Sequence, residues 1–145
     1  MRNIGSFVVL VALAVFSASI TACGQPTAPG RRQVLRVIPP VPMGPGSTTG
    51  VTVAVPGNGV VDMNFNWNPA AGGTLGVYVF GSELDQNACI LRRDCARAIR
   101  SVTDPSRPKL FELGVSAGPL YVLLVHASGE SDIVSNGEIG FIPAR

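Results

Sequence analysis

The chain has 145 residues and a mass of 15.0 kDa, and 46% of its residues are hydrophobic whereas only 14% are charged. This length is enough for one ordinary domain and excludes two domains of usual size. The formal net charge of +2 neither favours nor excludes a polyanionic partner. Because the charged fraction lies well below the usual quarter, we expect a strongly apolar segment somewhere along the chain.

The apolar excess is concentrated near the N-terminus. Arg2 supplies a positive charge there, and residues 7–16 contain no polar side chain. Ten residues of helix are about 15 Å long, which is half of a hydrocarbon core about 30 Å thick, so this run is too short to span a bilayer. It is typical of the apolar region of a secretory signal. The sequence therefore predicts a signal peptide over residues 1–22 and an exported protein.

The end of this segment resembles the lipobox of bacterial lipoproteins. Ile20, Thr21 and Ala22 precede Cys23, which gives an aliphatic residue, two small residues and a cysteine. The resemblance implies that Cys23 is lipidated and anchors the mature chain to a membrane through its acyl chains. In a host with two membranes, Gly24 in place of aspartate implies the outer membrane. The alternative is an ordinary secreted protein in which Cys23 is incidental.

Two cysteines, Cys89 and Cys95, remain in the predicted mature chain, and an even number in an exported protein indicates a disulfide. Their Cα atoms would be about 9 Å apart on a helix and about 20 Å apart on a strand, whereas a disulfide needs about 4.4–6.8 Å. The sequence therefore predicts a bent loop or irregular turn, closed by a bond that stabilises the fold by about 2 kcal/mol. Free thiols or metal ligands are the alternative, with His126 as the one histidine available.

Residues 23–48 are rich in proline and glycine. Such a composition favours an extended polyproline conformation, so we expect a lipidated tether that holds a folded domain off the membrane. Residues 33–38 have a strand-like composition and leave open a pairing with the edge of the domain. Arg31, Arg32 and Arg36 give the tether a local positive charge.

Short apolar runs alternate with turn residues over residues 49–145, and no sustained helical periodicity is present. The run at 120–127 is the most apolar and should be central, and a short helix is expected over 94–100. This pattern predicts one all-β domain, an antiparallel β-sandwich or barrel. The predicted strands are residues 51–55, 60–67, 75–80, 109–113, 120–127 and 138–142.

This domain resembles the bacterial pre-peptidase C-terminal-like (PPC-like) β-sandwich, a jelly-roll-like fold. The resemblance covers about residues 50–142 and rests on a strand that ends at Trp67, a Leu-Gly-Val-Tyr-Val run after it, and an Ala-Gly-Pro-Leu-Tyr-Val run late in the domain. It implies an accessory, non-catalytic domain used for binding or stability. Calcium sites of some relatives are not implied, because Gly73, Thr74 and Gly76 stand where the family often has acidic residues.

The strand at 60–67 presents one apolar and one polar face, since its residues alternate in character. Its polar face, with a carboxylate and amides about 7 Å apart, is a solvent face or a surface for sugar hydroxyls or a partner strand. The Asp-x-Asn-x-Asn order begins like a calcium loop but lacks the required Gly and Glu, so no metal site is predicted. Trp67 is expected in the core rather than as a platform for sugar stacking. The polar face comprises Asp62, Asn64, Asn66 and Asn68, and the apolar face Val61, Met63, Phe65 and Trp67.

Basic residues are concentrated over residues 92–109. A disulfide-closed, arginine-rich loop is suited to anionic glycans, lipid phosphates or an acidic protein through bidentate contacts, and a solvated insertion is the alternative. Nucleic acid is not expected, because the protein is predicted to be exported and no aromatic residues are interleaved with the arginines. The basic residues are Arg92, Arg93, Arg97, Arg100, Arg107 and Lys109.

The sequence contains no arrangement typical of catalysis. His126 is the one histidine, and neither a Gly-x-Ser-x-Gly motif nor a second zinc-binding histidine is present. No catalytic residue, metal or cofactor is therefore predicted. We expect a non-enzymatic, membrane-anchored binding or accessory module of the cell envelope, with an envelope protein or a glycan as partner. Two alternatives stay open: a structural or assembly subunit of an envelope complex without its own ligand, and a hydrolase that uses His126.

Overall fold

The structure is a computed structural model that describes residues 30–68 and 73–145. The predicted signal peptide and Cys23 lie outside these residues. The described part of the chain forms eight strands and one helix. They are β1 (Gln33–Met43), β2 (Thr48–Val55), β3 (Gly59–Trp67), β4 (Thr74–Phe80), α1 (Glu83–Arg92), β5 (Arg100–Val102), β6 (Lys109–Val115), β7 (Gly118–Ser128) and β8 (Ile133–Pro143).

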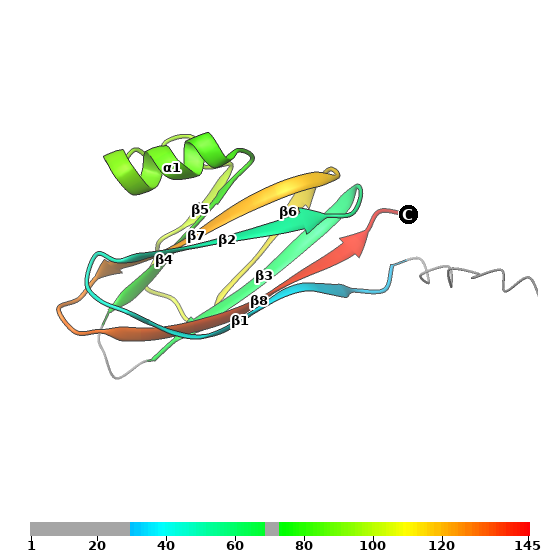
Figure 1. Cartoon of the computed structure of the whole chain (residues 1–145). Helices are drawn as coiled ribbons and strands as arrows, with labels where there is room; N and C mark the ends of the chain where they lie inside the picture. The colour runs from blue at the N-terminus through cyan, green and yellow to red at the C-terminus, as the bar shows by residue number, and fades with distance from the viewer. Residues whose placement is uncertain (1–29, 69–72) are drawn as a thin grey trace, which may run out of the picture.

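The strands pair as if the chain were folded in half and then rolled up. Strand β1 pairs with β8, β2 with β7, β3 with β6 and β4 with β5, and every pair is antiparallel. The pairs alternate between two sheets, which we call sheet A (order β1-β8-β3-β6) and sheet B (order β2-β7-β4-β5). Figure 1 shows the two sheets packed face to face. This connectivity is that of a jelly roll, so the predicted antiparallel β-sandwich is confirmed.

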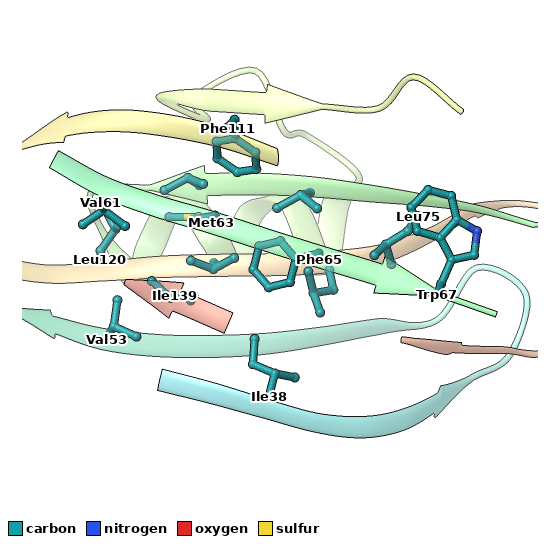
Figure 2. Packing of buried hydrophobic residues seen from close by; sticks show 14 of the residues in the cluster. Ile38, Val53, Val61, Met63, Phe65, Trp67, Leu75, Phe111, Leu120 and Ile139 are labelled. Carbon is teal, nitrogen blue, oxygen red and sulfur yellow. The ribbon is translucent and has the colours of Figure 1, made fainter. Parts of the chain in front are cut away.

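The core lies between the two sheets and is filled by alternating residues of each strand. Val61, Met63, Phe65 and Trp67 of β3 are all buried there, as predicted, and Figure 2 shows them along one side of the strand. Burial of each large apolar side chain contributes about 1.5–3 kcal/mol to folding. Strand β7 is an inner strand of sheet B, as expected of the most apolar run.

The sandwich begins earlier than predicted. Gln33–Met43, within the expected tether, forms β1 and pairs with β8 from Gln33 opposite Phe141 to Met43 opposite Ile133. The prediction that all of residues 23–48 form a tether was therefore wrong, and the possible edge pairing of residues 33–38 is confirmed. Prolines are tolerated in β1 because it is an edge strand whose register shifts between Ile38 and Val41.

The helix also lies elsewhere than predicted. It occupies Glu83–Arg92, whereas residues 94–99 form a loop and Arg100 begins β5. Ser82 caps the helix because its Oγ accepts a hydrogen bond of 3.2 Å from the amide of Asp85. The helix ends where Arg93 adopts a left-handed conformation with φ of 59°. In the described part of the chain, no helix is long and apolar enough to cross a membrane.

Candidate functional site

The outer face of sheet B is covered by α1. Phe80 and Leu123 on this face are buried together with Cys89 of the helix, and Figure 1 shows α1 lying across the sheet. Gln86 also attaches the helix to the sheet, because its buried Nε2 donates a hydrogen bond of 3.1 Å to the carbonyl oxygen of Val122 in β7. Sheet B therefore offers little free surface beneath α1.

The predicted disulfide holds the end of this helix. Cys89 and Cys95 are bonded, with their Cα atoms 4.4 Å apart. Cys89 lies in α1 rather than in a loop, so the expectation of a bent loop was right only for the residues after Arg92, where the left-handed Arg93 reverses the chain. The bond closes a short ring, which stabilises this region by about 2 kcal/mol in the chain-entropy description.

The outer face of sheet A has no covering element among the described residues, and its centre is polar. Asp62, Asn64 and Asn66 of β3 point outward, as predicted. Strand β8 extends this polar row, because Asn64 pairs with Glu138 and Asn66 pairs with Asn136. We call the surface formed by these five residues the sheet A trough.

Apolar side chains border the trough on both edges of the sheet. Val37 of β1 pairs with Glu138, and Leu110 of β6 pairs with Asn64, so one row of residues crosses all four strands. Val37 and Leu110 are 61% and 64% exposed, which is unusual for such residues. Pro39 and Pro40 add to the β1 border, and Pro108 extends the β6 border.

Three hollows follow one another along β3, and neighbouring hollows share Asn64 or Asn66. The central hollow has a volume of about 440 Å³. A second hollow of about 390 Å³ lies toward the start of β3, and a third of about 280 Å³ lies at its end. The central hollow is lined by Val37, Ile38, Pro39, Pro40, Asn64, Asn66, Pro108, Asn136, Gly137 and Glu138; the second by Arg32, Asp62, Met63, Asn64, Leu110, Phe111 and Glu112; and the third by Asn66, Trp67, Arg107 and Pro108.

Arg32 also contacts the trough, which no pattern in the sequence predicted. Its guanidinium pairs with Asp62 at 2.7 Å and with Glu138 at 2.6 Å. Hydrogen bonds to Asp62 and then to Glu138 raise the pKa of Arg32 above its ordinary value. Gly140 makes room for this network, because a Cβ there would lie 2.4 Å from Asp62 Oδ1 and 2.5 Å from Arg32 Cζ. The network spreads one positive charge over two carboxylates.

Trp67 is part of the core, as predicted, and does not form a surface for sugar stacking. Its Nε1 donates a hydrogen bond of 2.8 Å to the carbonyl oxygen of Gly73. The Arg107 guanidinium and the Lys109 ammonium lie 5.4 and 5.5 Å from the ring centroid, within the range of cation–π attraction. Trp67 therefore anchors the end of β3 next to the third hollow.

Lys109 does not belong to an exposed basic surface. Its side chain is fully buried, its Nζ lies 3.2 Å from Asp104 Oδ1, and it also donates a hydrogen bond to the Asp104 carbonyl. Hydrogen bonds from the Ser106 hydroxyl and amide, with a smaller contribution from Lys109, lower the pKa of Asp104 to about 2. The contacts between Lys109 and Asp104 hold the loop that precedes β6 against the core.

Of the arginines in the predicted basic loop, Arg107 lines the third hollow, whereas the other four lie elsewhere. Arg93 donates a hydrogen bond of 3.3 Å to the carbonyl oxygen of Gly46, and Arg97 lies 3.5 Å from Asp85. Arg92 lies at the end of α1, and Arg100 begins β5, an edge strand of sheet B. These four arginines therefore lie on the helix side of the molecule, away from the three hollows along β3.

His126 lies on the inner face of β7 and is only 1% exposed. Neither ring nitrogen has a hydrogen-bond partner in the part of the chain that the structure describes. A Cβ on Gly73 would lie 2.5 Å from Nε2, so backbone closes over the ring. A general base must reach a nucleophile and a substrate, and this position does not support a hydrolase that uses His126. Across residues 30–68 and 73–145, no three His, Cys, Asp or Glu side chains are grouped to hold a metal ion.

No family model matches the chain, and no curated protein matches it. Among solved structures, it is similar to a Paenibacillus sp. cycloisomaltooligosaccharide glucanotransferase complexed with cycloisomaltoheptaose, with a TM-score of 0.42 and 12% identity over 75% of this chain and 18% of that chain. It is also similar to a carbohydrate-binding module from Cellvibrio mixtus lichenase 5A in complex with cellotriose, with a TM-score of 0.41 and 10% identity over 81% of this chain and 88% of that chain. Likeness this distant says nothing about a ligand of this chain, whose candidate site rests on its own residues.

Proposed function

We propose that the protein is a lipid-anchored, non-enzymatic binding module of the bacterial cell envelope and that the sheet A trough is its binding face. The observation that carries this proposal is the difference between the two sheets. Helix α1 covers sheet B, whereas sheet A exposes a row of polar side chains, three adjoining hollows and an apolar border. An exposed apolar border around convergent polar groups is typical of interaction surfaces.

The position of β1 shortens the link to the proposed anchor. From Cys23 to Gln33 there are 33 − 23 = 10 residues. An extended chain spans at most about 3.6 Å per residue, so this link reaches no further than about 36 Å. A lipid at Cys23 would thus hold the sandwich close to the membrane, whereas a tether that continued to residue 48 would be two and a half times as long.

The anchor predicts incorporation of palmitate at one cysteine. Cells given radiolabelled palmitate should label the wild-type protein, and the Cys23→Ala variant should carry no label, because the acceptor thiol is gone. A Cys89→Ser/Cys95→Ser variant is the matched control and should be labelled like the wild type. Equal labelling of Cys23→Ala and the wild type would refute the anchor.

The binding face predicts where a partner touches the protein in cells. A photo-crosslinking amino acid in place of Asn64 should yield adducts with envelope material after irradiation, because this position lies between two hollows. The same amino acid in place of Thr52, which is exposed on β2 of sheet B, should yield few adducts. Adducts at position 52 and none at 64 would refute the trough as the binding face and favour a subunit of an assembly that is contacted elsewhere.

A further inference from the structure

The central hollow of the trough has a polar floor without an unpaired charge. Asn64, Asn66 and Asn136 supply three carboxamides, and each carboxamide both donates and accepts hydrogen bonds. Among the described residues, Glu138 is the one ionisable group that lines this hollow, and its carboxylate lies 2.6 Å from the guanidinium of Arg32. This floor complements groups that donate and accept without carrying charge, such as hydroxyls.

The walls of the hollow are apolar and narrowly spaced. Val37, Pro39 and Pro40 form one wall and Pro108 forms the other. Neighbouring strands lie about 4.8 Å apart, so the outer strands β1 and β6 are about 14 Å apart across β8 and β3. A pyranose ring has apolar C–H faces and a hydroxyl edge. Such a ring fits this space with its plane perpendicular to the sheet. Its hydroxyl edge then meets the asparagine amides of the floor, and its two C–H faces meet the valine and proline walls.

The arrangement of the three hollows in a row suits an extended, oligomeric ligand better than a single small molecule. The second and central hollows share Asn64, and the central and third hollows share Asn66. Residues two apart on a strand are separated by about 7 Å, so the two shared amides lie at successive positions along β3. A ligand that fills more than one hollow must therefore be extended along β3.

The charge of the second hollow distinguishes acidic glycans from neutral ones. Asp62 and Glu112 line the second hollow, and Arg32 there is already shared between Asp62 and Glu138. Three carboxylates thus face one guanidinium, which leaves an excess of negative charge beside the central hollow. Along the whole row of hollows, three carboxylates outnumber the guanidiniums of Arg32 and of Arg107, which lines the third hollow, so this face disfavours an acidic glycan relative to a neutral one.

We propose that the central hollow of the sheet A trough binds a sugar residue of an extended, neutral glycan. This assignment rests on the proposed function of the trough and names its ligand class. The amides hold the hydroxyl edge, the valine and proline walls contact the ring faces, and the neighbouring carboxylates exclude uronic acids and phosphorylated sugars.

The test uses the mature protein and two sets of immobilised oligosaccharides. The neutral set contains cello-, manno- and N-acetylchito-oligosaccharides, and the acidic set contains uronic-acid oligosaccharides. The wild type should bind at least one neutral series and none of the acidic series. The Asn64→Ala/Asn136→Ala variant should bind more weakly by about tenfold or more, because the hydrogen bonds of two carboxamides to the sugar are lost.

The Asn87→Ala variant is the matched control, since Asn87 is an exposed asparagine of α1, and it should bind like the wild type. Thermal melts of all variants establish that they are folded. Preference for the acidic set, equal affinity of the double variant, or no glycan binding would overturn the assignment. If no glycan binds but crosslinks form at position 64 to a protein, the trough remains the binding face and only the ligand class is wrong. If crosslinks are also missing, the proposed function fails as well.

Discussion

Replacement of Phe65 by alanine is expected to lower the free energy of unfolding by about 3–5 kcal/mol, which is a large part of the stability of a domain of this size. Phe65 is a fully buried residue of β3, and Figure 2 shows its ring within the core between the sheets. Its loss removes the apolar surface of a whole ring and leaves a cavity that the surrounding strands cannot close. Urea unfolding followed by the fluorescence of Trp67, the one tryptophan, measures the effect.

Two control variants test whether the decrease in the free energy of unfolding of Phe65→Ala arises from lost packing. Phe65→Leu retains most of the apolar volume and should cost less than Phe65→Ala. Asn64→Ala, on the same strand but on the outer face, should change the free energy of unfolding by no more than about 0.5 kcal/mol. A loss for Asn64→Ala as large as that for Phe65→Ala would show that β3 does not place these two residues on opposite faces.

Replacement of Gly137 by alanine is expected to lower the free energy of unfolding by about 1–3 kcal/mol, because the added methyl group has no room. Gly137 of β8 lies directly opposite Phe65. A Cβ at position 137 would lie 2.3 Å from Phe65 Cδ1 and 2.7 Å from the carbonyl oxygen of Asn64. The ring of Phe65 thus occupies the space that a side chain at 137 would need, and either the ring or strand β8 must shift.

Gly114→Ala is the matched control, because Gly114 lies in β6 of the same sheet and a Cβ there would meet nothing within 4 Å. This variant should be as stable as the wild type or more stable by up to about 1 kcal/mol, since alanine restricts the unfolded chain. In the Phe65→Ala background, Gly137→Ala should cost less than in the wild type, with a coupling energy of about 0.5–3 kcal/mol. Additive losses in the double variant would refute the proposed clash between the ring and the new methyl group.

Local patterns were sufficient to predict most strands of the sandwich. The strict alternation from Val61 to Trp67 predicted which face of β3 is buried, because a strand turns successive side chains to opposite sides. The apolar run at 120–127 indicated an inner strand for the same kind of reason: both faces of β7 are covered, one by the core and the other by α1. In each case the information lies within a single strand.

The predictions failed where a local preference is overridden by a neighbour distant in sequence. Pro39, Pro40 and Pro42 favour an extended tether, yet these residues belong to β1, which pairs with β8. The prolines are tolerated because β1 is an edge strand of sheet A, so one of its two sides makes no backbone hydrogen bonds to a neighbouring strand of the sheet. The helix at Glu83–Arg92 leaves its two leucines, Leu84 and Leu91, exposed, and its position depends on the contact of Cys89 with Phe80 and Leu123. Short-range composition does not contain these contacts.

Some residues of the candidate site could be predicted from the sequence, whereas others are brought to it only by the fold. Asp62, Asn64 and Asn66 could be selected from the sequence because they alternate with apolar residues on one strand. Arg32, Asn136 and Glu138 could not, because 30 residues or more separate each of them from its neighbours on β3. The hollows depend further on the prolines of β1 and of the loop before β6, which the jelly roll brings to opposite borders of one face.

The sequence by itself predicted an all-β domain, the residues of β3 that face the core, and a disulfide between Cys89 and Cys95, with free thiols as the alternative. These predictions follow from side-chain alternation and from the even number of cysteines in a chain expected to be exported. Only the tertiary structure decided that α1 covers sheet B, that no element of residues 30–68 and 73–145 covers sheet A, and that Arg32 closes an ion-pair network beside the central hollow. The physical reason is that the pairing of β1 with β8 and of β3 with both β6 and β8 joins segments far apart in the chain, and a surface built from four strands exists only once all four are paired.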